Sequence, residues 1–136
     1  MSWNDYITNL MGGPAKEGVM EDAAIVCFTE GQESVWAAHA SLRDITPAEV
    51  KKLISKDRSN IFTDGVMLGG QKCRVITDAL YQEDETMNLM TKDGNTICVA
   101  KGRTVLVLVK GCKSIHGRQL IQQTIEMAKY LKSMNF

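Results

Sequence analysis

Five of the eight aromatic residues in this 136-residue chain are arranged in a way that favours binding rather than reaction chemistry. Trp3 and Tyr6 lie near one end, Tyr130 and Phe136 near the other, and Trp36 is the remaining tryptophan. Aromatic residues that only build a core are expected inside apolar strands. We therefore expect the two ends to meet and to present one aromatic surface, which would bind something flat, apolar or rich in proline.

Residues that could perform catalysis are few. Cys112 and His116 are four positions apart and could form a nucleophile and its base, but no third orienting group or oxyanion-forming motif accompanies them. His39 is interpreted as an ordinary sheet histidine. Two histidines and four scattered cysteines match no zinc spacing, and the cysteines are expected to be reduced thiols. We expect no enzyme activity, no catalytic residue, no metal and no cofactor.

Charge and length limit the function classes further. Lys plus Arg and Asp plus Glu number 16 each, so the overall charge gives no reason to expect a nucleic-acid partner. The length suits one domain over residues 1–136. Polar residues interrupt the first apolar positions, and no apolar run could span a bilayer. We expect a cytoplasmic protein that is a monomer.

Three helices are predicted from caps and periodicity. Ser2 and Asp5 can cap a first helix that Gly12-Gly13-Pro14 ends. Thr46, with proline at the first helical position and glutamate three residues on, begins a helix that runs to about residue 55. Apolar residues at helical spacing predict a last helix over about 114–133, whose broad apolar face packs on a sheet.

The middle of the chain is predicted to be β-structure. The pattern of residues 23–29 and 35–39 predicts two strands that form a hairpin with its turn at Gly31. Glycine-containing and acidic turns separate six more short segments, which are 61–63, 66–68, 72–81, 86–92, 96–100 and 104–110. The predicted fold class is α+β: a central antiparallel meander, N- and C-terminal helices packed together on one face, and a short helix after the first hairpin.

The chain also resembles the animal-type profilin family. The resemblance runs in order from Trp3 to Phe136 and is carried by seven motifs. They are WNDYITNLM (3–11), VWAA (35–38), ITPAEV (45–50), KDRS (56–59), LGGQKC (68–73), HG (116–117) and EMAKYL (126–131). The resemblance implies a profilin-like fold and a protein that regulates actin polymerisation.

The first implied site is a groove for the proline-rich segments of actin-elongation factors. A polyproline II ligand arrives preorganised, stacks on aromatic faces and offers carbonyls to indole and phenol donors. Many profilins have a histidine at the position of Tyr130 and a terminal tyrosine at that of Phe136. Tyr130 keeps a hydrogen-bond donor, whereas Phe136 lacks the hydroxyl. The implied groove residues are Trp3, Tyr6, Trp36, Tyr130, Leu131 and Phe136.

The second implied site binds monomeric actin, and several of its positive charges are replaced here. Arginines are often found at the positions of Thr77 and Met90, a glycine at that of Arg118, and Asn-Lys-Lys at those of Ile121, Gln122 and Gln123. Lost ion pairs would weaken actin binding. The implied actin-binding residues are Phe62, Lys72, Arg74, Val75, Glu85, Lys92, Ile115, His116, Gln122 and Glu126.

The third implied activity is binding of anionic phosphoinositides at the membrane surface, through Lys72, Arg74, Lys92, Arg118 and Lys132. A merely solvated basic face explains these residues equally well. The alternative function is a polyproline and phosphoinositide binding module with weak or lost actin binding. With actin as partner, the expected location is cytoplasmic and associated with the cytoskeleton.

Overall fold

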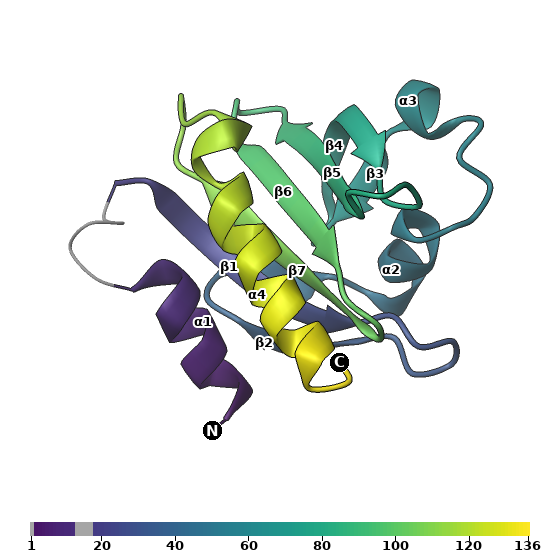
Figure 1. The fold of residues 1–136 in the computed structure, drawn as a ribbon. Coiled ribbons are helices and arrows are strands. Elements are labelled where there is room, and N and C mark those ends of the chain that lie inside the picture. The colour runs from purple at the N-terminus through teal and green to yellow at the C-terminus, as the bar shows by residue number, and fades with distance from the viewer. Residues whose placement is uncertain (1, 13–17) are drawn as a thin grey trace.

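One seven-stranded antiparallel sheet forms the centre of the molecule. The computed structural model describes residues 2–12 and 18–136 (Figure 1). The strand order is β2-β1-β7-β6-β5-β4-β3. The strands are β1 (Met20–Cys27), β2 (Ser34–Ala38), β3 (Val66–Leu68), β4 (Gln71–Ala79), β5 (Thr86–Thr91), β6 (Thr96–Lys101) and β7 (Val105–Gly111).

The predicted meander is confirmed for β3 to β7, whose neighbours in the chain are also neighbours in the sheet. The β1–β2 hairpin extends the sheet because β1 pairs with β7, with Ala24 opposite Leu108. Gly69 and Gly70 close the β3–β4 hairpin at φ values of 61° and 80°, which glycine adopts without strain. All strand contacts are therefore antiparallel.

The terminal helices α1 (Trp3–Met11) and α4 (Ile121–Ser133) lie side by side on one face of the sheet, as predicted (Figure 1). Beneath them a buried cluster joins Ile7 and Leu10 of α1, Leu131 of α4 and Val107 of β7. Because each helix buries one apolar face against the same strands, their outer faces are left side by side at the surface.

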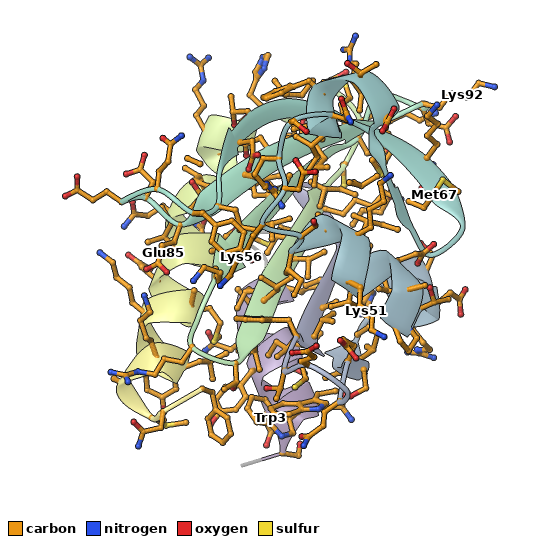
Figure 2. All side chains as sticks on the ribbon, turned by 90° about the vertical axis from the view of Figure 1, so that its right-hand side faces the viewer. Trp3, Lys51, Lys56, Met67, Glu85 and Lys92 are labelled. Carbon is orange, nitrogen blue, oxygen red and sulfur yellow. The ribbon has the colours of Figure 1, made fainter. Side chains whose placement is uncertain are left out.

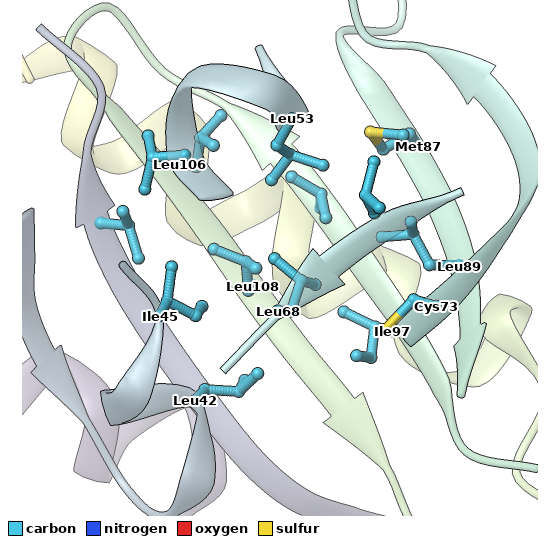
Figure 3. Close-up of a cluster of buried hydrophobic side chains, with 14 of the residues drawn as sticks. Leu42, Ile45, Leu53, Leu68, Cys73, Met87, Leu89, Ile97, Leu106 and Leu108 are labelled. Atoms are coloured by element: carbon cyan, nitrogen blue, oxygen red, sulfur yellow. The ribbon is translucent and has the colours of Figure 1, made fainter. Parts of the chain in front are cut away.

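The opposite face of the sheet carries η2 (Ser41–Asp44), α2 (Pro47–Leu53) and α3 (Ile61–Asp64). Figure 3 shows its core, where Leu42 and Leu53 meet Leu89 and Leu108 from the sheet. The helix predicted after the first hairpin is therefore present, and it packs on the face away from the terminal helices.

The predicted capping boxes form. The Ser2 backbone N–H donates to Asp5 Oδ2 at 2.9 Å. In α2 the Glu49 N–H donates to Thr46 Oγ1 at 3.2 Å, and the Thr46 N–H donates to Glu49 Oε1 at 3.0 Å. Glu49 also accepts from the N–H groups of Gly69 and Gly70, which ties α2 to the β3–β4 turn. The first helix was predicted to end at Gly12-Gly13-Pro14, of which Gly13 and Pro14 lie outside the described residues.

One predicted strand was wrong, and one predicted helix begins later than expected. Residues 61–63, expected as a strand, begin α3, because the Asp64 and Gly65 N–H groups donate to Asn60 and Ile61 carbonyls and Gly65 ends the turn at a φ of 67°. The last helix begins at Ile121 rather than near Ser114. Ser114 has a φ of 72°, and a short 3-10 turn, η3 (Gly117–Gln119), precedes the helix.

The cysteines agree with the expected reduced state. Cys27, Cys73 and Cys98 are buried, Cys112 is half-buried, and all four are free thiols. Burial raises the pKa of Cys73 to about 11 and that of Cys98 to about 12, so both remain protonated at neutral pH. Among the described residues, no helix is both long and apolar enough to cross a membrane.

Candidate functional site

Aromatic side chains from both ends of the chain and from β2 form one contiguous cluster. Trp3 is central to it: its ring centroid lies 5.4 Å from that of Tyr6, 4.7 Å from Trp36 and 4.9 Å from Phe136. Tyr6 continues the cluster to Tyr130 at 6.0 Å. The interplanar angles run from 50° to 87°, so the rings meet tilted or edge to face rather than stacked flat. We call this surface the aromatic groove.

The backbone of Phe136 is fixed by the β6–β7 turn. Its carbonyl oxygen accepts from the backbone N–H groups of Thr104 and Val105 at 2.6 and 3.1 Å, and its own N–H donates to the Leu131 carbonyl at 2.9 Å. Gly102 lies directly below, where a Cβ would come within 2.9 Å of the Phe136 oxygen. These contacts place the Phe136 ring edge-on to Trp36, with centroids 5.8 Å apart.

Exposure differs among the groove residues. Tyr6 is only 8% exposed, whereas Tyr130 is 47% exposed. Burial and the neighbouring Tyr130 phenol raise the pKa of Tyr6, so its hydroxyl remains a hydrogen-bond donor at neutral pH. Leu131, which the resemblance placed in the groove, has no exposed surface and lies in the core beneath the rings. Leu131 therefore lies beneath the rings and offers no surface to a ligand.

A cavity of about 290 Å³ lies between α1 and α4 and adjoins the groove through Tyr6 and Tyr130. We call it the interhelix cavity. Sequence reasoning missed it because it depends on how the two helices sit against each other. The Gln123 side chain on its wall has a buried oxygen that no hydrogen bond reaches within the described parts of the chain. Its other lining residues are Asn9, Leu10, Glu126 and Met127.

A second surface holds several of the residues expected to contact actin. In β4, Cys73 and Val75 face the core under α2, so the alternating Lys72 and Arg74 lie on the other face of the sheet, both exposed. Arg74 pairs across the strands with Met90 of β5. We call the exposed part of this face the β4–β5 face.

The η3 turn borders the β4–β5 face. A Cβ on Gly117 would lie 3.3 Å from Asn88 Oδ1 of β5, so the turn sits directly against that strand. His116 and Arg118 flank this glycine and are exposed. On the adjoining first turns of α4, Gln122 Nε2 donates to Glu126 Oε1 at 2.8 Å.

Other expected residues lie elsewhere or are already engaged. Val75 is 4% exposed, so its side chain belongs to the core rather than to a surface. Glu85 accepts hydrogen bonds from Lys132 and forms a 2.8 Å ion pair with Lys101, so Lys132 is paired within the chain. These two ammonium groups, through hydrogen bonding and charge, keep the pKa of Glu85 below its usual range although its burial opposes them. Ile115 is half-buried against Gly111.

The remaining expected residues are exposed. Phe62 is 56% exposed on α3, which packs against β4, and Lys92 directly follows β5. Figure 2 shows Trp3 and Lys92 at opposite ends of the molecule. The aromatic groove and the β4–β5 face are therefore separate surfaces. Among the residues that the structure describes, no three His, Cys, Asp or Glu side chains gather as a possible metal site.

Comparison with protein families finds the profilin model over residues 1–136. Among curated proteins, Profilin-2 of Rattus norvegicus is 42% identical over 142 residues, covering 98% of each chain. Among solved structures, mouse Profilin IIa in complex with a double repeat from the FH1 domain of mDia1 aligns with a TM-score of 0.90. It is 38% identical and the match covers 100% of both chains.

The same fold recurs at much lower identity. LokiProfilin1, solved in complex with rabbit actin, aligns with a TM-score of 0.66 at 13% identity and covers 96% of this chain and 94% of its own. That likeness concerns the fold alone.

Proposed function

This chain belongs to the profilin family, and from that premise we propose that it regulates actin polymerisation by binding monomeric actin and proline-rich segments on separate surfaces. The observation that carries the proposal is the aromatic groove. Rings from α1, β2, α4 and residue 136 meet at centroid distances of 4.7 to 6.0 Å. A plain contact between two helices does not require aromatic rings that also come from β2 and from the last residue of the sequence.

The groove suits a polyproline II helix. Such a ligand loses little conformational entropy on binding, and its rings pack on the tilted faces of Trp3 and Trp36. The phenol of Tyr130 is exposed and can donate to the ligand's carbonyls. The mouse Profilin IIa complex with an FH1 repeat of mDia1 supports this choice of partner. We assign proline-rich segments of actin-elongation factors as the ligands.

Actin is assigned to the β4–β5 face with its borders. Lys72 and Arg74 give this face positive charge, and His116 and Arg118 border it. Exposed charges of this kind set encounter rate and orientation more than affinity. Thr77 and Met90 are uncharged, and Thr77 Oγ1 accepts from the Asn88 amide at 2.9 Å within the face. The charges that remain therefore act mainly on the rate and orientation of actin binding and add only modestly to affinity.

Separation of the two surfaces allows both partners to bind at once. The groove lies at the end of the molecule marked by Trp3, and the actin surface extends toward Lys92 at the other end (Figure 2). Actin bound to this chain could therefore be delivered to a factor that holds the groove. The chain acts as an adaptor and performs no covalent chemistry.

Phosphoinositides are a second candidate ligand class, favoured by the exposed Lys72 and Arg74 on one strand. They share the actin surface, so headgroup and actin would compete. A headgroup at Lys132 would have to compete with the ion pair between Lys132 and Glu85. If actin binding proved weak, groove and headgroup binding would remain as the function of the chain.

The proposal is tested by measuring actin affinity with and without a saturating polyproline peptide, by calorimetry with ATP-bound monomeric actin. We expect actin to bind in both cases with similar affinity. Competition between the two ligands would overturn the adaptor function, and loss of actin binding alone would leave the polyproline and phosphoinositide module.

A further inference from the structure

The interhelix cavity is not used by the proposed function, although it shares two walls with the aromatic groove. Tyr6 and Tyr130 each face both spaces, with ring centroids 6.0 Å apart. A peptide that leaves the groove past these rings therefore reaches the cavity without crossing another element. Any ligand residue that flanks the proline stretch on that side would have this cavity beside it.

One wall of the cavity is apolar. Leu10 of α1 is 2% exposed and Met127 of α4 is 7% exposed, and both line the space. The volume of about 290 Å³ lies at the lower limit for small-ligand pockets. The cavity therefore fits one long side chain with an apolar stem rather than a second stretch of peptide.

The cavity carries one carboxylate, that of Glu126, whose Oε1 also accepts from Gln122, together with amide and phenol groups that can both donate and accept. Glu126 is exposed and brings a carboxylate, and the buried Gln123 side-chain oxygen has no hydrogen-bond partner in the described chain. Among the described residues, 2–12 and 18–136, no lysine, arginine or histidine lines the space.

We propose that the interhelix cavity binds a lysine or arginine side chain that flanks the proline stretch of the ligand. The aliphatic stem would pack on Leu10 and Met127, and the N–H donors would reach Glu126 and Gln123. The proposal rests on the proposed polyproline binding. It adds a rule for ligand choice: a basic flank is favoured and an acidic flank is disfavoured.

Synthetic peptides test this rule directly. One polyproline sequence is prepared without a flank and with arginine, glutamine or glutamate added at either end, and each affinity is measured by tryptophan fluorescence at low and physiological salt. Arginine at one of the two ends should strengthen binding by about three- to tenfold relative to glutamine, because it adds one partly exposed ion pair and hydrogen bonds. Glutamate at the same end should weaken it, and salt should reduce both effects.

Variants locate the effect. Glu126→Gln and Gln123→Leu should each bring the affinity ratio of the arginine and glutamine peptides toward one. Glu83→Gln, which removes an exposed carboxylate from the β4–β5 turn, should leave that ratio as it is. Equal affinity for all flanks, or an arginine gain that survives Glu126→Gln and Gln123→Leu, would overturn the inference.

The same series separates this inference from the function on which it rests. If the plain polyproline peptide binds and no flank changes its affinity, only the basic-residue site fails. If no peptide binds at all, the assignment of the groove fails, and this inference fails with it.

Discussion

The ring of Phe136 meets that of Trp3 edge to face, with centroids 4.9 Å apart and planes at 84°, although the two residues lie near opposite ends of the chain. Hydrogen bonds from Thr104 and Val105 hold the backbone of Phe136 in place. The groove is therefore part of the folded framework, and its shape depends on the docking of the last residue.

This dependence predicts the effect of shortening that side chain. Phe136→Ala removes a ring that supports both tryptophans, so we expect polyproline affinity to fall by roughly tenfold and the free energy of unfolding by about 2 kcal/mol. Fluorescence titration and urea denaturation measure the two effects. Phe136→Tyr keeps the ring and should retain both the polyproline affinity and the free energy of unfolding. If Phe136→Tyr lowered them as much as Phe136→Ala does, this explanation would be contradicted.

Trp3 and Phe62 give a pair of opposite predictions. Trp3→Ala should weaken polyproline binding at least tenfold, since Trp3 contacts three other rings of the groove, and should leave actin binding nearly unchanged. Phe62→Ala, at an exposed aromatic outside the groove, should do the reverse. Binding of both ligands is measured for both variants. Loss of polyproline binding in Phe62→Ala with retention in Trp3→Ala would remove the assignment of the surfaces.

Arg74 is predicted to carry part of the actin affinity. Arg74→Ala should weaken actin binding several-fold and make the affinity less dependent on salt, because an exposed charge pair is worth roughly 0.2 to 1 kcal/mol. Calorimetric titrations at two salt concentrations measure this. Arg103→Ala, at an exposed arginine before β7, is the matched control. Equal effects of the two substitutions would show that Arg74 has no special part.

The Arg58–Asp78 pair predicts a pH effect on stability. Arg58 donates to both Asp78 oxygens at 2.8 and 2.9 Å and also to the Leu53 and Ser55 carbonyls, so it joins β4 to the end of α2. These hydrogen bonds hold the pKa of Asp78 below its usual value. The stabilisation is therefore fully present above the unfolded pKa of about 3.9 and is lost as pH falls through the lower folded pKa.

Asp78→Asn should accordingly lower the free energy of unfolding by about 2 kcal/mol at neutral pH and by much less at the acid end of the range. Urea denaturation across pH measures the difference. Asp84→Asn, at an exposed turn residue, should change little at any pH. A constant cost of Asp78→Asn at every pH would show that charge is not the cause.

Much of the fold was predictable from local signals in the sequence. The capping boxes at Ser2 and Thr46 and the glycine turn at Gly69 and Gly70 gave the right elements, because each depends on residues within a few positions. The strand expected at 61–63 was wrong because this segment lacks such a local signal. Its three residues carry no period of their own, and the turn is decided by Asn60 and Gly65 on either side.

The aromatic groove was foreseen from residue types, whereas its details required the fold. Leu131 lies between groove residues in the sequence yet is buried, because its position on α4 faces the sheet. Pairing of Lys132 with Glu85 joins residues far apart in the chain and leaves no local signal. The interhelix cavity likewise depends on how α1 and α4 pack together.

The most direct test of the function is calorimetric titration of this protein into ATP-bound monomeric actin, at low and at physiological salt. We predict binding in the micromolar range or tighter, weakened by salt, from protein that also binds polyproline. Absence of actin binding at both salt concentrations, from protein that still binds polyproline, would contradict the proposed regulation of actin polymerisation.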